Sequence, residues 1–152
     1  MPAKQSLDQS DYQRLAEFRY QLRGFLKFSE RAASKMGLRP QQHQALLAIK
    51  GLEPMQSATI GVLAERLQIQ HHSAVELMDR LEKRGMIRRH RSRSDRRKVL
   101  VELTKRGDTK LKRVSLPHRD ELQSAGRRLV HALARFISHD GVRPISKTKR
   151  RK

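Results

Sequence analysis

The 152-residue sequence contains no cysteine and no tryptophan, and aromatic residues make up only 4% of it. Without cysteine, a disulfide scaffold, a thiol-based redox sensor, a cysteine zinc site and an iron–sulfur centre are all excluded. Apolar runs are short as well, because the longest, residues 45–49, falls far below the roughly 20 residues that span a bilayer. No charged-then-apolar leader opens the sequence. We therefore expect a soluble protein that is not exported and has no membrane partner.

Acidic residues are also scarce, since 15 Asp and Glu stand against 35 Lys and Arg, a formal net charge of +20. Much of this charge lies in two segments, 80–98 and 143–152, and the second contains no acid. A chain of this length fits one domain, and a charge of +20 points to a polyanion as its partner. We interpret residues 1–10 as an N-terminal tail and 139–152 as a basic, disordered tail.

The parts of an active site are missing too. The sequence has no Gly-rich phosphate loop, no Gly-x-Ser-x-Gly motif and no paired carboxylates that can be placed together. His72 and Glu76 have the spacing of two metal ligands on one helix face, but no third ligand can be assigned. For His43, His118, His131 and His139 we expect structural or dimer-packing roles rather than metal ligation. The sequence therefore predicts no enzyme, no cofactor and no metal site.

Helical periodicity runs through most of the chain, which predicts a mainly α (α+β) fold. Apolar residues recur at steps of three and four in segments 11–35, 41–50, 60–67, 71–84, from 105 onward, and 129–137. Thr59 and Thr104 are candidate N-caps, and Gly37 and Gly85 are natural helix terminators. We expect Pro117 to kink or end the helix that follows Thr104.

After Gly85 the apolar period changes from 3.6 to 2, which predicts strands over 86–90 and 99–103 around a polar tip. Helix, three-residue turn, helix and basic ribbon together form a winged helix-turn-helix. Ala64 supplies the small residue that two steeply packed helices need. Gln68 stands in the turn, where a left-handed conformation costs about 1 kcal/mol. The expected inward residues are Leu63, Leu67, Ile69, Ala74 and Leu77.

Over residues 12–138 the chain resembles the MarR family of bacterial transcription regulators. Four pieces carry the resemblance, at family-like spacings: residues 59–67, 77–89, 95–97 and 103–107. It implies a MarR-type domain over 11–138, with a winged helix-turn-helix over about 40–104 and dimerisation helices over 11–36 and 105–138. It also implies a cytoplasmic, nucleoid-associated homodimer that binds a palindromic operator in double-stranded DNA. Many relatives are repressors released by a small aromatic effector.

The major groove of the duplex admits one α-helix, whose outward residues near the N-terminus reach the base edges. We expect that role for the helix that begins near His71. Glu76 stands where relatives more often carry arginine, and it either accepts from a cytosine amino group or orients Arg80. The candidate DNA-contacting residues of this helix are Gln70, His71, His72, Ser73, Val75, Glu76 and Arg80.

The wing tip is expected to reach the adjacent minor groove, whose negative potential attracts arginine. In relatives, an aspartate buttresses the wing through an arginine, which implies a pair between Asp95 and Arg97. Arg93 and Arg96 then remain for the groove and the phosphates, and Arg88 and Arg89 flank the strand near the DNA backbone. The candidate wing contacts are Arg88, Arg91, Arg93, Ser94, Asp95, Arg96 and Arg97.

The terminal helices are expected to form the subunit interface. The residues that we assign to it are Leu15, Phe18, Leu22, Phe25, Leu129, Leu133 and Phe136. The competing hypothesis is a winged-helix protein that organises DNA without sequence preference. Histidine, serine, glutamine and glutamate at the outward helix positions favour base reading, whereas lysine and small residues throughout would favour packaging.

Overall fold

The computed structural model describes residues 7–53 and 55–139. The chain divides into two compact units, a central unit over 28–120 and a terminal unit formed by 7–27 and 121–139. Most of the predicted N-terminal tail and nearly all of the basic tail over 139–152 lie outside the described residues. No helix among the described residues is long and apolar enough to cross a membrane.

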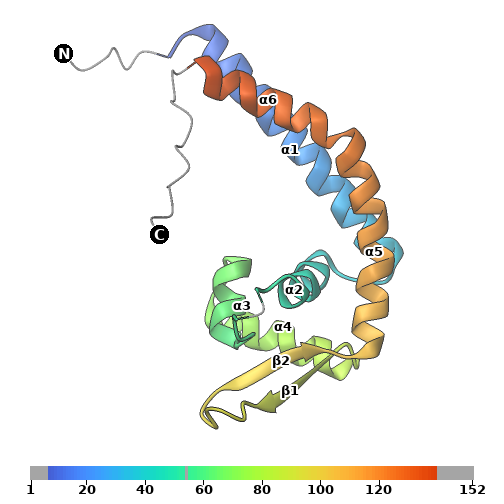
Figure 1. Cartoon of the computed structure of the whole chain (residues 1–152). Coiled ribbons are helices and arrows are strands. Elements are labelled where there is room, and N and C mark those ends of the chain that lie inside the picture. Colours follow the sequence, from blue (N-terminus) through green and yellow to red (C-terminus); the bar gives the residue numbers. More distant parts are fainter. Residues whose placement is uncertain (1–6, 54, 140–152) are drawn as a thin grey trace, which may run out of the picture. The chain divides into compact units, whose positions relative to one another are not determined.

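The central unit contains the predicted helix-turn-helix and wing, labelled in Figure 1. Its elements are the end of α1 (Gln9–Lys35), α2 (Pro40–Lys50), α3 (Ile60–Leu67), α4 (His71–Lys83), β1 (Ile87–Arg91), β2 (Val99–Leu103) and most of α5 (Lys105–Ser124). One buried cluster joins all of them and includes Leu46, Leu63, Met78, Leu81 and Met86. This cluster fixes α4 and the wing on a common base.

Local sequence signals determine the turn between α3 and α4. The Thr59 hydroxyl accepts a hydrogen bond from the Val62 N–H at 3.3 Å, which caps α3 as predicted. Gln68 takes the left-handed conformation, with φ 53° and ψ 42°, so the predicted backbone cost is present. The Ile69 N–H then donates to the Ala64 carbonyl at 3.0 Å, which closes the turn. The three-residue connection to α4 is therefore confirmed.

The wing is an antiparallel pair in which Ile87 lies opposite Leu103 and Arg91 opposite Val99. β1 begins one residue later than predicted, because the Met86 N–H still donates to the Leu81 carbonyl at the end of α4, at 3.0 Å. At the base of the wing the Thr104 hydroxyl donates to the Gly85 carbonyl at 2.6 Å and accepts from the Gly107 N–H at 3.1 Å. These bonds join the start of α5 to the wing.

Gly107 allows this junction to close. A Cβ atom at this position would lie 2.0 Å from the Met86 carbonyl oxygen, closer than any real contact. The helix and the end of the preceding turn therefore approach each other only because residue 107 has no side chain.

Pro117 does not end α5, which continues to Ser124 and then gives way to α6 (Gly126–His139). The expectation that proline would end the helix there is therefore wrong. His118 donates from its ring to the Val114 carbonyl at 2.7 Å and contacts the Ser29 hydroxyl at 2.8 Å, so the segment around Pro117 is bonded to α1. Such tertiary contacts offset the local penalty of an internal proline.

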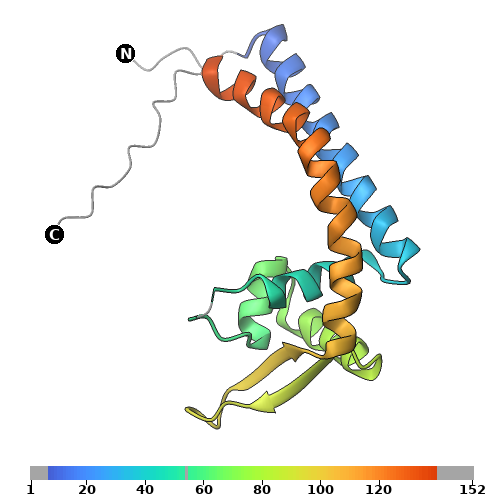
Figure 2. The same cartoon turned by 45° about the vertical axis from the view of Figure 1, so that its right-hand side comes forward.

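The terminal unit consists of the first part of α1 together with α6, which lie side by side in both views (Figures 1 and 2). Its apolar residues are poorly covered. Ala132 is buried, whereas the side chains of Leu15, Val130, Leu133 and Ile137 are exposed. The unit therefore presents apolar surface to its surroundings.

Candidate nucleic-acid interface

Helix α4 separates its residues by face as the periodicity predicts. Ala74, Leu77, Met78 and Leu81 are buried in the core. His71, His72 and Glu76 are exposed, and Ser73 and Val75 are partly exposed. Gln70 stands at the N-cap without a side-chain capping bond, so its amide is available for another partner. The first two turns of α4 thus present polar groups of several hydrogen-bonding types on a rigid helix.

Glu76 forms an ion pair with Arg80, with the carboxylate 3.2 Å from the guanidinium nitrogen. Both side chains are more than half exposed, so the pair contributes only about 0.3–0.5 kcal/mol to stability. The contact matches the predicted orienting role of Glu76. Whether Glu76 also reads a base stays a prediction.

The wing tip exposes a row of arginines. Arg91 donates to the Arg96 carbonyl at 2.9 Å, so one arginine shapes the tip and holds its backbone. Ser92 is buried and its hydroxyl lies 3.0 Å from that of Ser94. Among the ion pairs of the described residues, none involves Arg93, Arg96 or Arg97. The tip therefore carries uncompensated positive charge on a short hairpin.

The predicted side-chain pair between Asp95 and Arg97 is not found. The Asp95 carboxylate instead accepts the backbone N–H of Arg97 at 3.0 Å. A carboxylate two residues before an N–H closes a local Asx-type turn, which needs no guanidinium. Asp95 therefore shapes the tip through the backbone, and the Arg97 side chain stays available.

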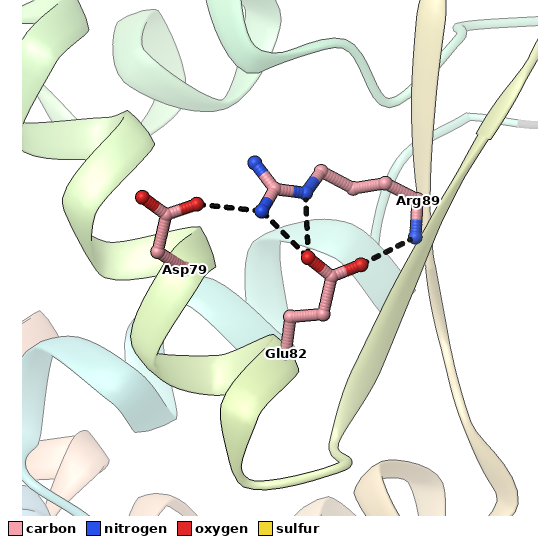
Figure 3. A network of polar contacts seen from close by, with 3 residues as sticks. All are labelled: Asp79, Glu82 and Arg89. Carbon is pink, nitrogen blue, oxygen red and sulfur yellow. Dashed lines mark hydrogen bonds and ion pairs between the residues drawn. The ribbon is translucent and has the colours of Figure 1, made fainter.

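Arg88 and Arg89, both predicted to lie near phosphates, are already engaged. Arg88 pairs with Glu102 on the opposite strand. Arg89 bonds to two carboxylates of α4, donating from its guanidinium to Glu82 at 2.6 and 2.9 Å and to Asp79 at 2.5 Å (Figure 3). Its backbone N–H also donates to Glu82 at 3.2 Å. The expectation of a phosphate contact for Arg89 is replaced by a structural role.

This network links the recognition helix to the wing. Hydrogen bonds from Arg89, then its positive charge, lower the pKa of Glu82 below the ordinary value, and the two carboxylates raise the pKa of Arg89. Arg89 is the least exposed of the three side chains, at 27%. Sequence reasoning missed the network because Asp79 and Glu82 lie in a helix and Arg89 in the next strand. Their three-residue spacing on one face of α4 was the available signal.

A second cluster joins three helices of the central unit. The His43 ring on α2 is buried and its centre lies 4.7 Å from that of His118 on α5. Phe28 on α1 meets His118 edge-on at 5.6 Å. Burial, and then the neighbouring His118, lower the pKa of His43. The predicted packing roles of His43 and His118 are confirmed.

The predicted interface residues of the terminal helices differ in exposure. The side chains of Leu15 and Leu133 are exposed at 45% and 40%. The other five, Phe18, Leu22, Phe25, Leu129 and Phe136, are partly buried within the chain. Sequence reasoning did not single out Val130 and Ile137, which share the exposed face of α6 with Leu133. The assignment of these residues to a subunit interface stays a prediction.

Comparisons of the sequence and of the structure with known proteins agree with one another. A model of the MarR family matches residues 36–98. The HTH-type transcriptional repressor MdtR of Bacillus subtilis is 30% identical over 104 residues, which cover 68% of this chain and 58% of that relative. The chain thus spans less than two thirds of the length of this relative.

Two solved structures have a fold similar to that of this chain. The transcriptional repressor CouR, bound to a 23-mer DNA duplex, is 28% identical, covers 90% of this chain and 99% of its own, and has a TM-score of 0.62. AbsC, a MarR family regulator from Streptomyces coelicolor, is 16% identical, covers 90% and 95%, and has a TM-score of 0.71. At that identity AbsC supports the fold alone. The predicted winged helix-turn-helix fold is confirmed.

Proposed function

Because the chain belongs to the MarR family of transcription regulators, we propose that it binds double-stranded DNA as a homodimer and regulates transcription from a palindromic operator. Membership of this family agrees with the expectation that the chain is not an enzyme. The observation that carries the proposal is the placement of α4. Its buried face anchors it in the core, while its first two turns present histidine, serine and glutamine beside an arginine-rich wing.

Base reading is proposed for the outward residues of α4. A helix in the major groove reaches the base edges with its N-terminal side chains, and His71, His72 and Ser73 each donate or accept hydrogen bonds. Val75 is partly exposed and suits the methyl group of thymine. Gln70, Glu76 and Arg80 complete the proposed surface.

Backbone and minor-groove contacts are proposed for the wing. Arg93 and Arg96 have no carboxylate partner in the described part of the chain, so their guanidinium groups are available for phosphates or for a narrow minor groove. Arg91, Ser94 and Arg97 extend this surface. Such contacts supply affinity and register without sequence information. Arg88 contributes only if it releases Glu102.

A homodimer would cover the exposed apolar residues of the terminal unit, and its two-fold symmetry predicts a palindromic site. Leu15 on α1 and Leu133 on α6 would be covered by a second copy. Two copies related by a two-fold axis then place their recognition helices roughly 34 Å apart, one turn of the duplex. The operator should therefore be an inverted repeat with half-sites one helical turn apart.

Repression and release by a small aromatic effector form the finer part of the proposal. MdtR and CouR are both named as repressors. A bound dimer represses when its operator overlaps a promoter, and we place the protein in the bacterial cytoplasm with the nucleoid.

The competing function, DNA packaging without sequence preference, is favoured by the net charge of +20. Selection of bound duplexes from a random pool at about 150 mM salt separates the two, because salt weakens non-specific phosphate binding steeply. An enriched inverted repeat with half-sites one turn apart supports the regulator. Tight, salt-sensitive binding with no enriched motif would overturn it in favour of packaging.

A further inference from the structure

The terminal unit holds a cavity of about 400 Å³ between α1 and α6. One face of α1 contributes Ser10, Gln13, Arg14, Glu17 and Gln21, and one face of α6 contributes Arg128, His131, Ala132 and Arg135. Pockets that hold small organic molecules measure roughly 300–1,000 Å³, so this cavity is large enough for one. It contains none of the residues assigned to the DNA interface.

The lining of this cavity is positively charged. It includes three arginines and one glutamate, whose carboxylate accepts a hydrogen bond from the Gln21 amide at 2.8 Å. Within residues 7–53 and 55–139, neither Arg128 nor Arg135 has a carboxylate within ion-pair distance. The segment 126–139 that forms α6 contains no acidic residue at all. The two α6 guanidinium groups therefore share a concave surface without a counter-charge.

Arg14 adds a buried donor that lacks an acceptor. Its side chain is only 13% exposed, and its terminal nitrogen pairs with Asp11 at 2.6 Å. Its Nε is buried and has no hydrogen-bond partner in the described part of the chain. A buried donor left without an acceptor is costly, so Arg14 is held in this wall with part of its hydrogen-bonding capacity unused. Even with Asp11 counted against Arg14, the lining keeps an excess of one positive charge.

We propose that this cavity binds a small organic anion through a carboxylate or phosphate group. Guanidinium groups recognise both oxyanions with paired, charge-assisted hydrogen bonds, and the exposed side chains of Arg128 and Arg135 supply the donors. Arg14 adds positive charge to the wall. The His131 ring offers one more polar contact, and the buried Ala132 side chain provides an apolar contact for the rest of the ligand. The site does not depend on DNA binding, so it can be tested without an operator.

Thermal unfolding of the full chain tests the site, with chloride replaced stepwise by inorganic phosphate or by acetate at constant ionic strength and pH. A bound anion raises the unfolding midpoint with the logarithm of its concentration. Arg128→Gln and Arg135→Gln should each weaken the apparent anion affinity about tenfold, the effect of one lost charge-assisted bond. Arg127→Gln removes the same charge from the next position of α6, outside the cavity lining, and should leave the affinity unchanged.

The unfolding responses to phosphate and to acetate distinguish the two classes of ligand. A response to phosphate alone indicates a phosphate-bearing ligand, a response to acetate alone indicates a carboxylate, and a response to both supports the shared oxyanion chemistry. The proposal is overturned if wild type responds to neither anion, or if all three variants lose affinity equally, because the effect is then diffuse surface charge. It is also overturned if the two cavity variants weaken self-association and leave the anion response intact, which would assign the cavity to a second copy. Circular dichroism confirms beforehand that each variant is folded.

Discussion

At the scale of single residues, the contact between buried His43 and partly exposed His118 makes the central unit sensitive to pH. The His43 ring is 3% exposed and lies beside a second imidazole, so a positive charge there is disfavoured. Its pKa is lowered, first by burial and then by His118. In the unfolded chain the same ring takes up a proton near its ordinary pKa of 6.5. Protonation therefore favours the unfolded state.

We predict that the free energy of unfolding decreases as the pH falls from about 6.5 to the lowered pKa of folded His43. Above pH 6.5 this decrease should be absent. His43→Gln should flatten the decline, since no proton is then taken up at residue 43. His71→Gln, at an exposed position, should keep the wild-type slope. Urea unfolding at a series of pH values measures both. An unchanged slope in His43→Gln would refute this linkage.

Arg89 shows what sequence patterns leave out at this scale. The chain has 35 basic residues, and ten of them lie between Arg80 and Lys98, so spacing alone did not reveal which arginine is structural. The structure identifies Arg89 as the structural arginine, because Asp79 and Glu82 of α4 face β1 and bond to its guanidinium (Figure 3). Asp95 was paired with Arg97 because the resemblance to the MarR family implied it, whereas the Asp95 carboxylate closes a backbone turn.

At the scale of elements, the junction of α5 with the wing depends on Gly107. We predict that Gly107→Ala destabilises the protein by about 1–3 kcal/mol or more, because the new methyl group overlaps the Met86 backbone. Gly61→Ala is the matched control, since a Cβ there meets only the Thr59 hydroxyl oxygen at 4.0 Å. Inside α3 that change should stabilise the protein by about 0.5–1 kcal/mol. Denaturant unfolding compares the two, and equal effects of the same sign would contradict this account.

Most elements could be predicted from the sequence because their signals are local. The cap at Thr59, the left-handed turn at Gln68 and the change of period after Gly85 placed α3, α4 and the strands within a residue or so. Pro117 does not end its helix, because the helix is supported by contacts with α1, which lies about 90 residues away in the chain. The cavity of the terminal unit likewise combines two helix faces that are far apart in the sequence, so no short sequence motif predicts it.

At the scale of the whole molecule, the exposed apolar residues of α1 and α6 support the proposed homodimer. Leu133 is 40% exposed and shares its face of α6 with exposed Val130 and Ile137. Monomers that leave such rows uncovered carry an interaction surface. We therefore keep the dimer as the proposed assembly.

We predict that Leu133→Glu weakens self-association by about 100-fold or more, because a carboxylate would be buried in an apolar contact. Met55→Glu introduces the same charge at an apolar residue that is 95% exposed in the central unit, and should leave the dimer intact. Analytical ultracentrifugation over a range of concentrations measures both variants. A wild-type chain that stays monomeric throughout would contradict the proposed assembly.

The central claim is that α4 reads sequence while the wing supplies affinity. It is tested most directly by titrating the selected duplex and a random duplex with wild type, His72→Ala and Arg96→Ala at several salt concentrations. Arg96→Ala should weaken binding to both duplexes alike and reduce the salt slope by about one. His72→Ala should weaken the selected duplex about tenfold, the cost of one base contact, and leave the random duplex unchanged. Equal losses on the two duplexes for His72→Ala would contradict the account, because α4 would then contact only the DNA backbone.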